Sequence, residues 1–363
     1  MKKKNLIFFL PEFVRGGAGK SILSLCSNLD SKKFNIYVLC LGKCEYKKEF
    51  KNIAKIYEIK KKKTIFAQSD INNIINQISQ NGLKIIFISN LFHTNVLTGI
   101  FQSKNDNVKF IFTERTTLSE LFTYFGFFDF VKKMVIKILI KFSYKQSDII
   151  LANSIKVAKD IAEYTNFRTT HIYPGSFNKF HKRVFKKNKI KNIVWIGRLA
   201  KEKGLEILFK SINEIDKNRY RLKILGDGPL RKKMELKVKN LNLEKNIKFI
   251  GFKKDISFFL KKCDLLINTS YFEGFPNVVI EALSYSVPVI CSKSHGGIYE
   301  ILKNGYYGDL FDLEIDGSLT KKINSFFKNP KKLIKKAHAS KKHLINFEQK
   351  KSAKKYEKIF EKL

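Results

Sequence analysis

Cysteine and proline are scarce in this chain, whose 363 residues include five cysteines and six prolines. The cysteines stand at positions 26, 40, 44, 263 and 291 and form no CxxC pair. Their odd number and wide spacing argue against a disulfide framework and against a zinc site. We therefore expect reduced thiols and a protein of the cytoplasm.

Long apolar runs are also lacking. The opening segment has an apolar run of about six residues before Pro11, which is shorter than the core of a secretory signal, so we expect a buried strand. The most apolar later stretch, residues 121–142, is interrupted by one aspartate and four lysines. Neither segment has the length and apolar character to cross a bilayer, so no transmembrane helix is predicted.

Acidic residues are few. The chain has 71 lysines and arginines against 32 aspartates and glutamates, a formal net charge of +39. Such a charge attracts nucleic acid, an anionic membrane or phosphorylated substrates, although the even spread of lysines also fits compositional drift. Motifs that read nucleic acid are not visible, so a nucleic-acid partner is not expected.

Short apolar runs alternate with longer stretches of mixed polarity, which is typical of strand–helix units, parallel sheets and an α/β fold. The expected strands of the first half are residues 5–10, 35–41, 84–89, 109–113 and 148–152. Those of the second half are residues 192–196, 221–225, 247–250, 264–268, 287–291 and 308–311. Turn formers and basic residues fill 173–191. The sequence thus predicts one Rossmann-like domain over 1–178, a second over 190–340, and a final helix over 341–363.

Loops after the predicted strands of the second half carry glycine and charge. Ligands of open parallel sheets bind at the carboxyl ends of the strands, so we expect the site there. The first loop runs from Gly197 to Gly204, where Arg198 and Lys203 suit a diphosphate. Lys203 also fits a solvated helix start. A later loop contains Phe252, which suits either a nucleotide base or the core.

The most informative loop spans residues 270–283 and contains Glu273 and Glu281, with seven residues between them. Pro276 is expected in the first turn of a helix, which places Glu273 before that helix and Glu281 within it. Backbone N–H groups at a helix start point at an anion, here those of Phe275, Asn277 and Val278. Glu281 beside alanine and leucine is costly unless a ligand satisfies it, the alternative being a solvated outer face.

In chain order these pieces resemble glycosyltransferase family 4, the retaining enzymes of the GT-B fold that use nucleotide sugars. The match covers about residues 190–310 and, more weakly, residues 13–18. The resemblance implies two Rossmann-like domains facing a cleft, with the final helix crossing back to the first domain. It also implies that Arg198 and Lys203 hold the donor diphosphate, that Glu281 binds the ribose hydroxyls and that Glu273 contacts the donor sugar.

The first half carries the acceptor side in this resemblance. Gly16 and Gly17 are expected in a loop that closes over the diphosphate. The family often has a histidine near the reacting sugar, and His93 is the candidate, with a structural role as the alternative. Glu114 and Arg115 follow the next strand and suit either the acceptor or an ordinary salt bridge. The candidate catalytic residues are Glu273, Arg198, Lys203 and His93.

Rival interpretations differ in their chemistry. A GT-A glycosyltransferase would bind a metal through an Asp-x-Asp triplet, which this sequence lacks, so we expect no metal and no cofactor. Residues 14–21 resemble a phosphate-binding P-loop of an NTPase, yet Val14 stands where that motif requires glycine. A sugar-nucleotide epimerase of the same fold would share the donor pocket without an acceptor site.

Residues 118–145 mix aromatic and aliphatic side chains with lysines, as interfacial helices do. One interpretation lays this segment on the anionic inner face of the cytoplasmic membrane. The alternative is a core helix whose lysines face water. The full prediction is a metal-independent, retaining hexosyltransferase that moves a sugar from a nucleotide diphosphate, by family frequency UDP, to a glycan or lipid-linked acceptor. Such transfer belongs to lipopolysaccharide, capsule or other cell-surface polysaccharide or glycoconjugate synthesis.

Overall fold

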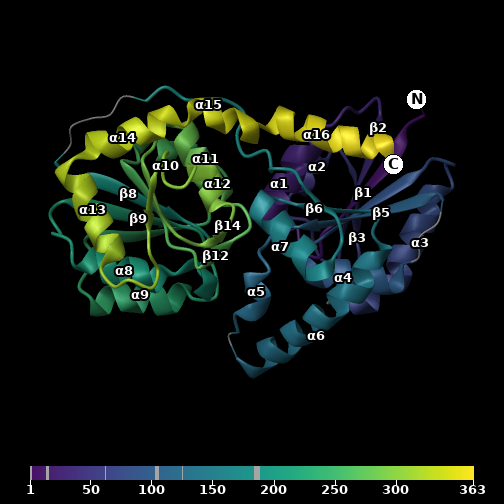
Figure 1. Ribbon diagram of the computed structural model, residues 1–363, viewed down its shortest axis with the longest axis horizontal. Coiled ribbons are helices and arrows are strands. Elements are labelled where there is room, and N and C mark those ends of the chain that lie inside the picture. Colours follow the sequence, from purple (N-terminus) through teal and green to yellow (C-terminus); the bar gives the residue numbers. More distant parts are fainter. Residues whose placement is uncertain (1, 14–15, 62, 103–105, 125, 184–188) are drawn as a thin grey trace. The chain divides into compact units, whose positions relative to one another are not determined.

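The computed structural model describes residues 2–13, 16–61, 63–102, 106–124, 126–183 and 189–363. Val14 and Arg15, which belong to the weak N-terminal match and to the P-loop alternative, lie outside the described residues. The chain divides into two compact units. Unit 1 contains Met1–Gly175 and Phe347–Leu363, and unit 2 contains Ser176–Asn346. Each unit is a parallel sheet covered by helices, which is the Rossmann-like α/β architecture (Figure 1).

The sheet of unit 1 has the strand order β3-β2-β1-β4-β5-β6-β7, with parallel neighbours. The strands are β1 (Lys4–Phe9), β2 (Phe34–Cys40), β3 (Lys55–Glu58), β4 (Ile85–Asn90), β5 (Val108–Glu114), β6 (Ile149–Ala152) and β7 (Thr169–His171). Central β1 is apolar throughout because both of its faces are covered. Leu6 and Phe8 pack on one face, and Ile7 and Phe9 pack on the other.

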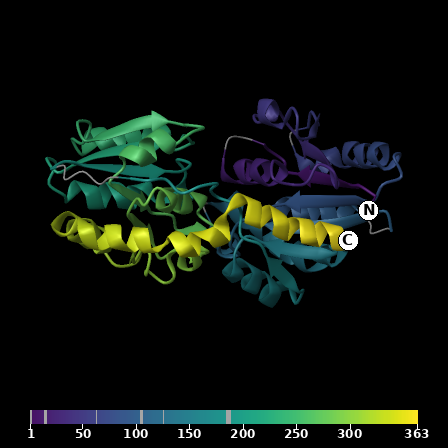
Figure 2. The ribbon, with the colours of Figure 1, turned by 90° about the horizontal axis from the view of Figure 1, so that it is seen from above.

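Helices cover both faces of this sheet. They are α1 (Gly17–Cys26), α2 (Lys47–Phe50), α3 (Gln68–Ser79), α4 (Phe92–Phe101), α5 (Ser119–Phe122), α6 (Phe127–Ser143) and α7 (Ile155–Thr165), with the 3₁₀ turns η1 (Thr64–Ala67) and η2 (Tyr144–Gln146). The last helix, α16 (Gln349–Lys362), also packs on this unit (Figure 2). Its Phe360 is buried, with its ring 6.4 Å from Phe8 and 5.9 Å from Phe34. Lys4 Nζ donates to Glu361 O at 2.8 Å, so the first strand and the last helix are joined.

The sheet of unit 2 has the strand order β10-β9-β8-β11-β13-β15, and β12 pairs separately with β14. The strands are β8 (Lys191–Ile196), β9 (Tyr220–Leu225), β10 (Ile247–Gly251), β11 (Leu265–Asn268), β12 (Phe272–Glu273), β13 (Val289–Ser292), β14 (His295–Gly296) and β15 (Asp309–Phe311). The helices are η3 (Lys201–Lys203), α8 (Leu205–Asn213), α9 (Arg231–Asn240), α10 (Ser257–Lys262), α11 (Asn277–Ser284), α12 (Ile298–Leu302), α13 (Ser318–Lys328), α14 (Pro330–Ala339), α15 (Lys341–Leu344) and η4 (Ile345–Phe347). Trp195, Phe209 and Leu222 are among the residues of its core.

Every strand predicted from the sequence is present, and each begins and ends within two residues of its expected limits. The prediction missed β3 and β7, which form the two edges of the sheet in unit 1, and the short strands β12 and β14. Edge strands bury fewer side chains than central strands, so their apolar pattern is weak. Among the described residues, no helix combines the length and hydropathy required to span a bilayer.

The chain passes between the units twice, after Gly175 and after Asn346. Unit 1 ends at Gly175, and the residues that follow pack on unit 2. There the ring of His181 stacks on Tyr285 at 3.8 Å, and Arg183 Nη2 lies 3.4 Å from Asp264 Oδ1. At the other connection, the predicted final helix of residues 341–363 is divided. Its first part, α15, belongs to unit 2, and the chain joins unit 1 from Phe347 onward.

Candidate functional site

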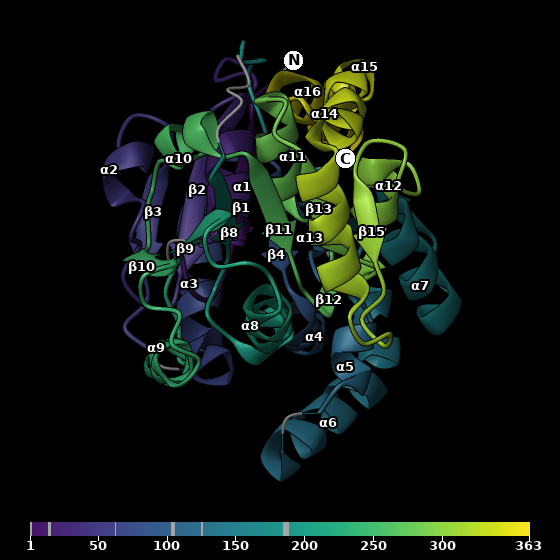
Figure 3. The ribbon, with the colours of Figure 1, turned by 90° about the vertical axis from the view of Figure 1, so that its left-hand side faces the viewer.

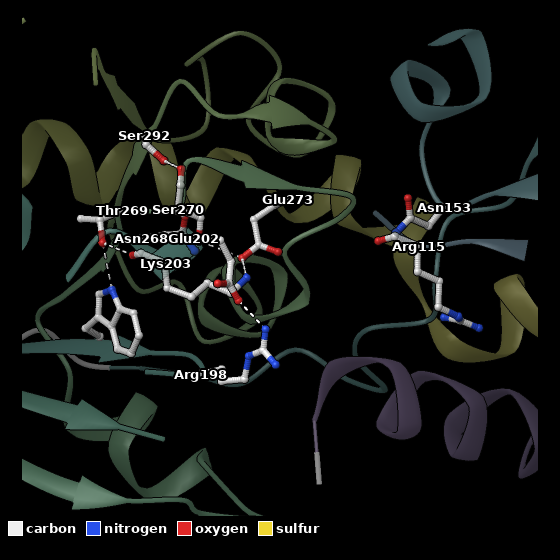
Figure 4. Close-up of polar contacts among 11 residues, drawn as sticks. Arg115, Asn153, Arg198, Glu202, Lys203, Asn268, Thr269, Ser270, Glu273 and Ser292 are labelled. Carbon is white, nitrogen blue, oxygen red and sulfur yellow. Dashed lines mark hydrogen bonds and ion pairs between the residues drawn. The ribbon is translucent and has the colours of Figure 1, made fainter. Parts of the chain in front are cut away.

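The loop after β8 is held against the end of β11 in unit 2. Gly204, which closes this loop, has a φ of 62°, and a Cβ at this position would lie 2.2 Å from Thr269 O. A side chain is therefore excluded by both the backbone conformation and the close approach. Thr269 Oγ1 accepts from Trp195 Nε1 at 3.1 Å and donates to Lys203 O at 2.8 Å. The buried threonine thus fixes the backbone from which the Lys203 side chain extends (Figure 4).

Lys203 and Glu273 form an ion pair above these strand ends. Lys203 Nζ lies 2.5 Å from Glu273 Oε1, and Ser270 Oγ donates to the same oxygen at 2.9 Å. Ser292 Oγ in turn donates to Ser270 O at 2.5 Å. Each side chain of the pair is 19% exposed. The two charges are therefore oriented by neighbouring groups (Figure 4) and still partly exposed, as a ligand site requires.

Glu273 is the second residue of β12, which pairs with β14. Its partner in that pair is Gly296. Arg198 lies on the loop after β8, where its Nη2 is 2.6 Å from Glu202 Oε1. The Arg198 side chain is 68% exposed, so this pair contributes little to stability and leaves the guanidinium accessible to an anion. Tyr271 N donates to Glu202 O at 2.9 Å, which joins this loop to the segment before Glu273.

The helix after Glu273 begins one residue later than the sequence predicts. Pro276 is its N-cap residue, and α11 starts at Asn277. The first backbone N–H groups of the helix therefore belong to Asn277 and Val278, and Phe275 is buried before it. Glu281 lies half-buried in the second turn of α11.

Two further residues predicted for the donor site directly follow strands of unit 2. Gly197 directly follows β8, and its N donates to Leu225 O at 3.0 Å, so the ends of β8 and β9 are in register. Phe252 follows β10 and is 38% exposed. An exposed ring at a strand end is compatible with contact to a nucleotide base.

In unit 1, Arg115 lies at the carboxyl ends of the central strands. Its Nε donates to Asn90 Oδ1 at 2.8 Å, and its carbonyl oxygen accepts from Asn153 Nδ2 at 2.8 Å. Burial lowers the pKa of the guanidinium below its ordinary value. The side chain borders a cavity of about 10 Å³ together with Ser21 and Tyr356. That volume holds about one water molecule, and Arg115 as a whole is half-buried.

Glu114, also predicted on the acceptor side, is buried. It is the last residue of β5 and faces the side of the sheet that buries Phe110 and Phe112. Its Oε1 accepts from Asn95 Nδ2 at 2.6 Å and from the Tyr144 hydroxyl. Burial raises the pKa of this carboxyl to about 8, because its effect is larger than the lowering of the pKa by those two hydrogen bonds. Glu114 is only 1% exposed, and its described contacts are with side chains of unit 1.

His93 is the second residue of α4. Burial lowers its pKa to about 4, and the nearby Lys132 adds to that effect, so the imidazole is neutral at physiological pH.

Gly16 is the N-cap of α1, and its N lies 3.3 Å from Tyr46 Oη. A Cβ on Gly17 would meet no atom within 4 Å.

The P-loop alternative was set aside because of Val14, and the backbone around Lys20 is helical. α1 begins at Gly17, and Lys20 N donates to Gly16 O at 3.0 Å. Lys20 is thus a residue of the first helical turn.

Two residues of the donor side were missed by the sequence analysis. Thr269 and Ser270 supply the hydrogen bonds that orient Lys203 and Glu273. Ser270 stands three residues before Glu273, and a hydroxyl at that spacing was the available signal. The role of Thr269 depends on Trp195, which is distant in sequence, so only the tertiary structure reveals it.

Comparisons with known proteins agree for both units. The model of the family described as glycosyl transferases group 1 matches residues 176–343, and that of glycosyltransferase family 4 matches residues 15–175. One relative is the N-acetylgalactosamine-N,N'-diacetylbacillosaminyl-diphospho-undecaprenol 4-alpha-N-acetylgalactosaminyltransferase of Campylobacter jejuni, which is 26% identical over 269 residues, 71% of this chain and 70% of the relative.

A second relative from Campylobacter jejuni is 33% identical over 134 residues, 36% of this chain and 37% of its own length. It is named GalNAc-alpha-(1->4)-GalNAc-alpha-(1->3)-diNAcBac-PP-undecaprenol alpha-1,4-N-acetyl-D-galactosaminyltransferase. Among solved structures, Anabaena Alr3699/HepE in complex with UDP and glucose has the same fold, with a TM-score of 0.80, 18% identity and 99% of both chains covered.

Proposed function

This chain belongs to glycosyltransferase family 4, and from that premise we propose that it is a retaining hexosyltransferase acting on a lipid-linked glycan. The donor in this proposal is a nucleotide diphosphate sugar bound by unit 2. The sugar is transferred without a metal ion or other cofactor, and the biological setting is the synthesis of a cell-surface polysaccharide or glycoconjugate.

The observation that carries the proposal is the Lys203–Glu273 pair. Its 2.5 Å contact joins a loop after β8 to a loop after β11, at the carboxyl ends of neighbouring strands. A cation beside a carboxylate at this edge suits a ligand with an anionic group next to hydroxyl groups. A sugar diphosphate is such a ligand, with its phosphates toward Lys203 and its sugar toward Glu273.

The remaining donor-side residues have complementary roles in this proposal. Arg198 and the first N–H groups of α11 stabilise the negative charge that develops on the departing diphosphate. These groups supply the positive potential that a metal supplies in other transferases. Glu281 accepts from the ribose hydroxyls, and Phe252 contacts the base. Catalysis then rests on positioning and on leaving-group stabilisation.

The relatives support the choice of donor and acceptor. The Anabaena structure of the same fold contains UDP, which favours UDP as the nucleotide. Both Campylobacter relatives are named for undecaprenol-linked substrates that carry a diphosphate, which favours a lipid-linked acceptor. Their names also specify an α linkage, and transfer with retention from an α-linked nucleotide sugar yields an α product. We place the enzyme at the inner face of the cytoplasmic membrane, with Arg115 and His93 toward the acceptor.

The test is thermal stability of the purified chain with UDP, GDP, ADP and ATP, each with and without EDTA. One diphosphate at about 100 times its Kd is expected to add about 2.7 kcal/mol of stability and to do so in EDTA. Lys203→Ala should abolish that shift. Lys201→Ala is the matched control, because it removes an exposed lysine from the same loop and should preserve the shift.

Two outcomes would contradict the proposal. A shift that appears only with ATP and magnesium would favour the NTPase alternative. If NMR showed that the bound UDP-sugar is converted into its epimer without transfer, that result would favour an epimerase. Formation of a glycosylated lipid with an α anomeric proton coupling is the expected result.

A further inference from the structure

Helix α6 exposes its apolar side chains and buries a polar one. Five large apolar residues on it follow one another at spacings of three, four, three and four residues, which places them along one face of a helix. They are Phe128, Val131, Val135, Ile138 and Phe142, and they are called the apolar stripe below. Phe128 is 89% exposed, Ile138 57% and Phe142 65%. An ordinary surface helix has one apolar face, which packs on the core, whereas this stripe is open to solvent.

The opposite face of α6 is the one that packs on unit 1. Ile136, Ile140 and Ser143 are buried there, together with Lys133. Lys133 Nζ donates to Thr123 O at 2.7 Å and lies 2.8 Å from Asp129 Oδ2. The buried face is therefore complete, and the stripe is a second apolar face that the fold of unit 1 does not use. Figure 3 shows α6 extending outward from the rest of unit 1.

Lysines border the stripe on both sides. At 100° per residue, Lys132 falls on one flank and Lys137 and Lys141 fall on the other. Lys137 Nζ donates to Tyr124 Oη at 2.9 Å and lies 4.6 Å from the centre of the Phe122 ring. Lys141 Nζ lies 5.2 Å from the Tyr164 ring. Aromatic rings thus hold these two ammonium groups along the edge of the apolar face.

We propose that the apolar stripe inserts into an anionic lipid bilayer and that the flanking lysines bind its headgroups. This rests on the proposed function, because a lipid-linked acceptor is presented at such a surface. Charge complementarity selects the bilayer over a protein partner, since α6 has four lysines and one aspartate, and that aspartate is paired with Lys133. An apolar face between rows of lysines is the arrangement by which helices lie in a membrane interface.

The attachment of α6 gives this contact a consequence for the acceptor side. Tyr164 Oη donates to Lys137 O at 3.0 Å, and the residue directly after α6, Tyr144, donates to Glu114. Glu114 immediately precedes Arg115 in the chain. The helix is therefore fixed to the strand end that carries Arg115, so insertion of the stripe sets the orientation of that edge of unit 1 relative to the lipid surface.

The experiment is binding of the whole chain to vesicles of phosphatidylcholine with and without 30 mol% (roughly one lipid in three) phosphatidylglycerol, a composition typical of anionic inner leaflets. Wild-type protein should sediment with the anionic vesicles at least about tenfold more tightly, and high salt should weaken that binding. The double variant Ile138→Asp, Phe142→Asp should lose at least about tenfold in affinity. Leu236→Asp is the control, because Leu236 on α9 of unit 2 is 59% exposed and lies outside the stripe.

Insertion itself is tested with a fluorescent reporter. The natural chain has one tryptophan, Trp195, and it is buried in unit 2. Fluorescence of a Phe128→Trp variant should be quenched by brominated lipids, whereas a Leu236→Trp variant should be unaffected. Equal binding to both vesicle types, binding retained by the double variant, or a dimer in solution that protects the stripe would each overturn the proposal.

The same samples separate this proposal from the proposed function. The double variant should keep the UDP-induced thermal shift, which also shows that it is folded. Vesicle binding that is lost while the UDP shift is retained in the double variant supports the membrane surface. A wild-type chain that binds UDP and ignores anionic vesicles disproves the membrane surface alone, and one that binds vesicles and ignores every nucleotide disproves the transferase alone.

Discussion

Glu273 and Glu114 each end a strand at the carboxyl edge of their unit, and their surroundings are opposite. Glu273 is paired with Lys203, accepts from Ser270 and is partly open to solvent. Glu114 has no cationic partner among the described ion pairs, is buried, and has a pKa raised to about 8 by that burial. Position at the edge of a parallel sheet therefore does not by itself make a carboxylate functional. The direction of the side chain and the compensation of its charge decide.

The same substitution at both positions tests this comparison. Glu273→Gln removes the charge that faces Lys203 and is expected to lower kcat about 100-fold, since an oriented charge near the reacting group is lost. The unfolding free energy should change by only about 1 kcal/mol, because one hydrogen-bonded pair is weakened. Transfer assays and chemical denaturation measure the two effects.

A matched control for Glu273→Gln is Asp316→Asn. Asp316 also pairs with a lysine, Lys210, at 2.7 Å, but both side chains are largely exposed. This variant should keep full activity. If Glu273→Gln were as active as Asp316→Asn, Glu273 would have no role in transfer and the comparison would collapse.

Glu114→Gln is expected to alter the pH dependence of stability and to leave kcat within about threefold of wild type, because Glu114 is buried. The folded-state pKa of about 8 lies above the ordinary value of 4.5. Between these values the unfolded chain releases a proton that the folded chain keeps. The free energy of unfolding that Glu114 contributes is thus fully present below about pH 4.5. It is lost as the pH rises toward 8, by at most about 1.4 kcal/mol per pH unit.

The measurement for this second prediction is denaturant unfolding of wild type and Glu114→Gln at intervals from pH 5 to pH 9. The wild type should lose stability relative to the variant as the pH rises, and the difference should level off above about pH 8. Parallel pH profiles would show that Glu114 is ionised inside the folded protein.

Thr269→Val tests how Lys203 is positioned, and its expected change in transfer kinetics is smaller than that of Glu273→Gln. The substitution leaves Trp195 Nε1 without its acceptor and Lys203 O without its donor, at a cost of about 1–3 kcal/mol in stability. The KM for the donor should rise severalfold while kcat changes less. Thr269→Ser keeps the hydroxyl and should restore the stability and the KM. Equal KM values for the two variants would show that the Thr269 hydroxyl does not position the Lys203 loop.

The sequence predicted the GT-B fold and the strands because central strands are apolar on both faces, as in β1. It also named Lys203 and Glu273, but not their contact. These residues are 70 positions apart, and Glu273 is placed by the β12–β14 pair, whose strands of two residues each show no apolar pattern. Such a pair forms because the loops around it are already packed, which the local sequence does not reveal.

The sequence did not predict the burial of Glu114, because it did not predict where the strand ends. The expected strand ended at residue 113, whereas β5 continues to Glu114. One extra residue in the strand fixes the side chain on the face occupied by Phe110 and Phe112, because successive side chains point to opposite faces. Strand ends are set by tertiary hydrogen bonds, here that of Asn153 N to Glu114 O, and the apolar pattern does not contain them.

Helix α6 shows a different limit of sequence analysis. The lysines predict an interfacial helix or a core helix with lysines toward water, and both interpretations fit the same periodicity. The structure shows which face unit 1 covers, because Lys133 is buried and Phe128 is exposed. A helix with two apolar faces carries no local signal for which face the protein covers.

The return of the chain to unit 1 has a consequence for protein synthesis. Unit 2 is one continuous segment, whereas unit 1 is finished only when Phe347–Leu363 have been translated. Until then the nascent chain lacks Phe360, which covers Phe8 and Phe34. All of unit 2 is therefore translated before unit 1 is complete, and until then the N-terminal sheet exposes apolar surface that chaperones bind.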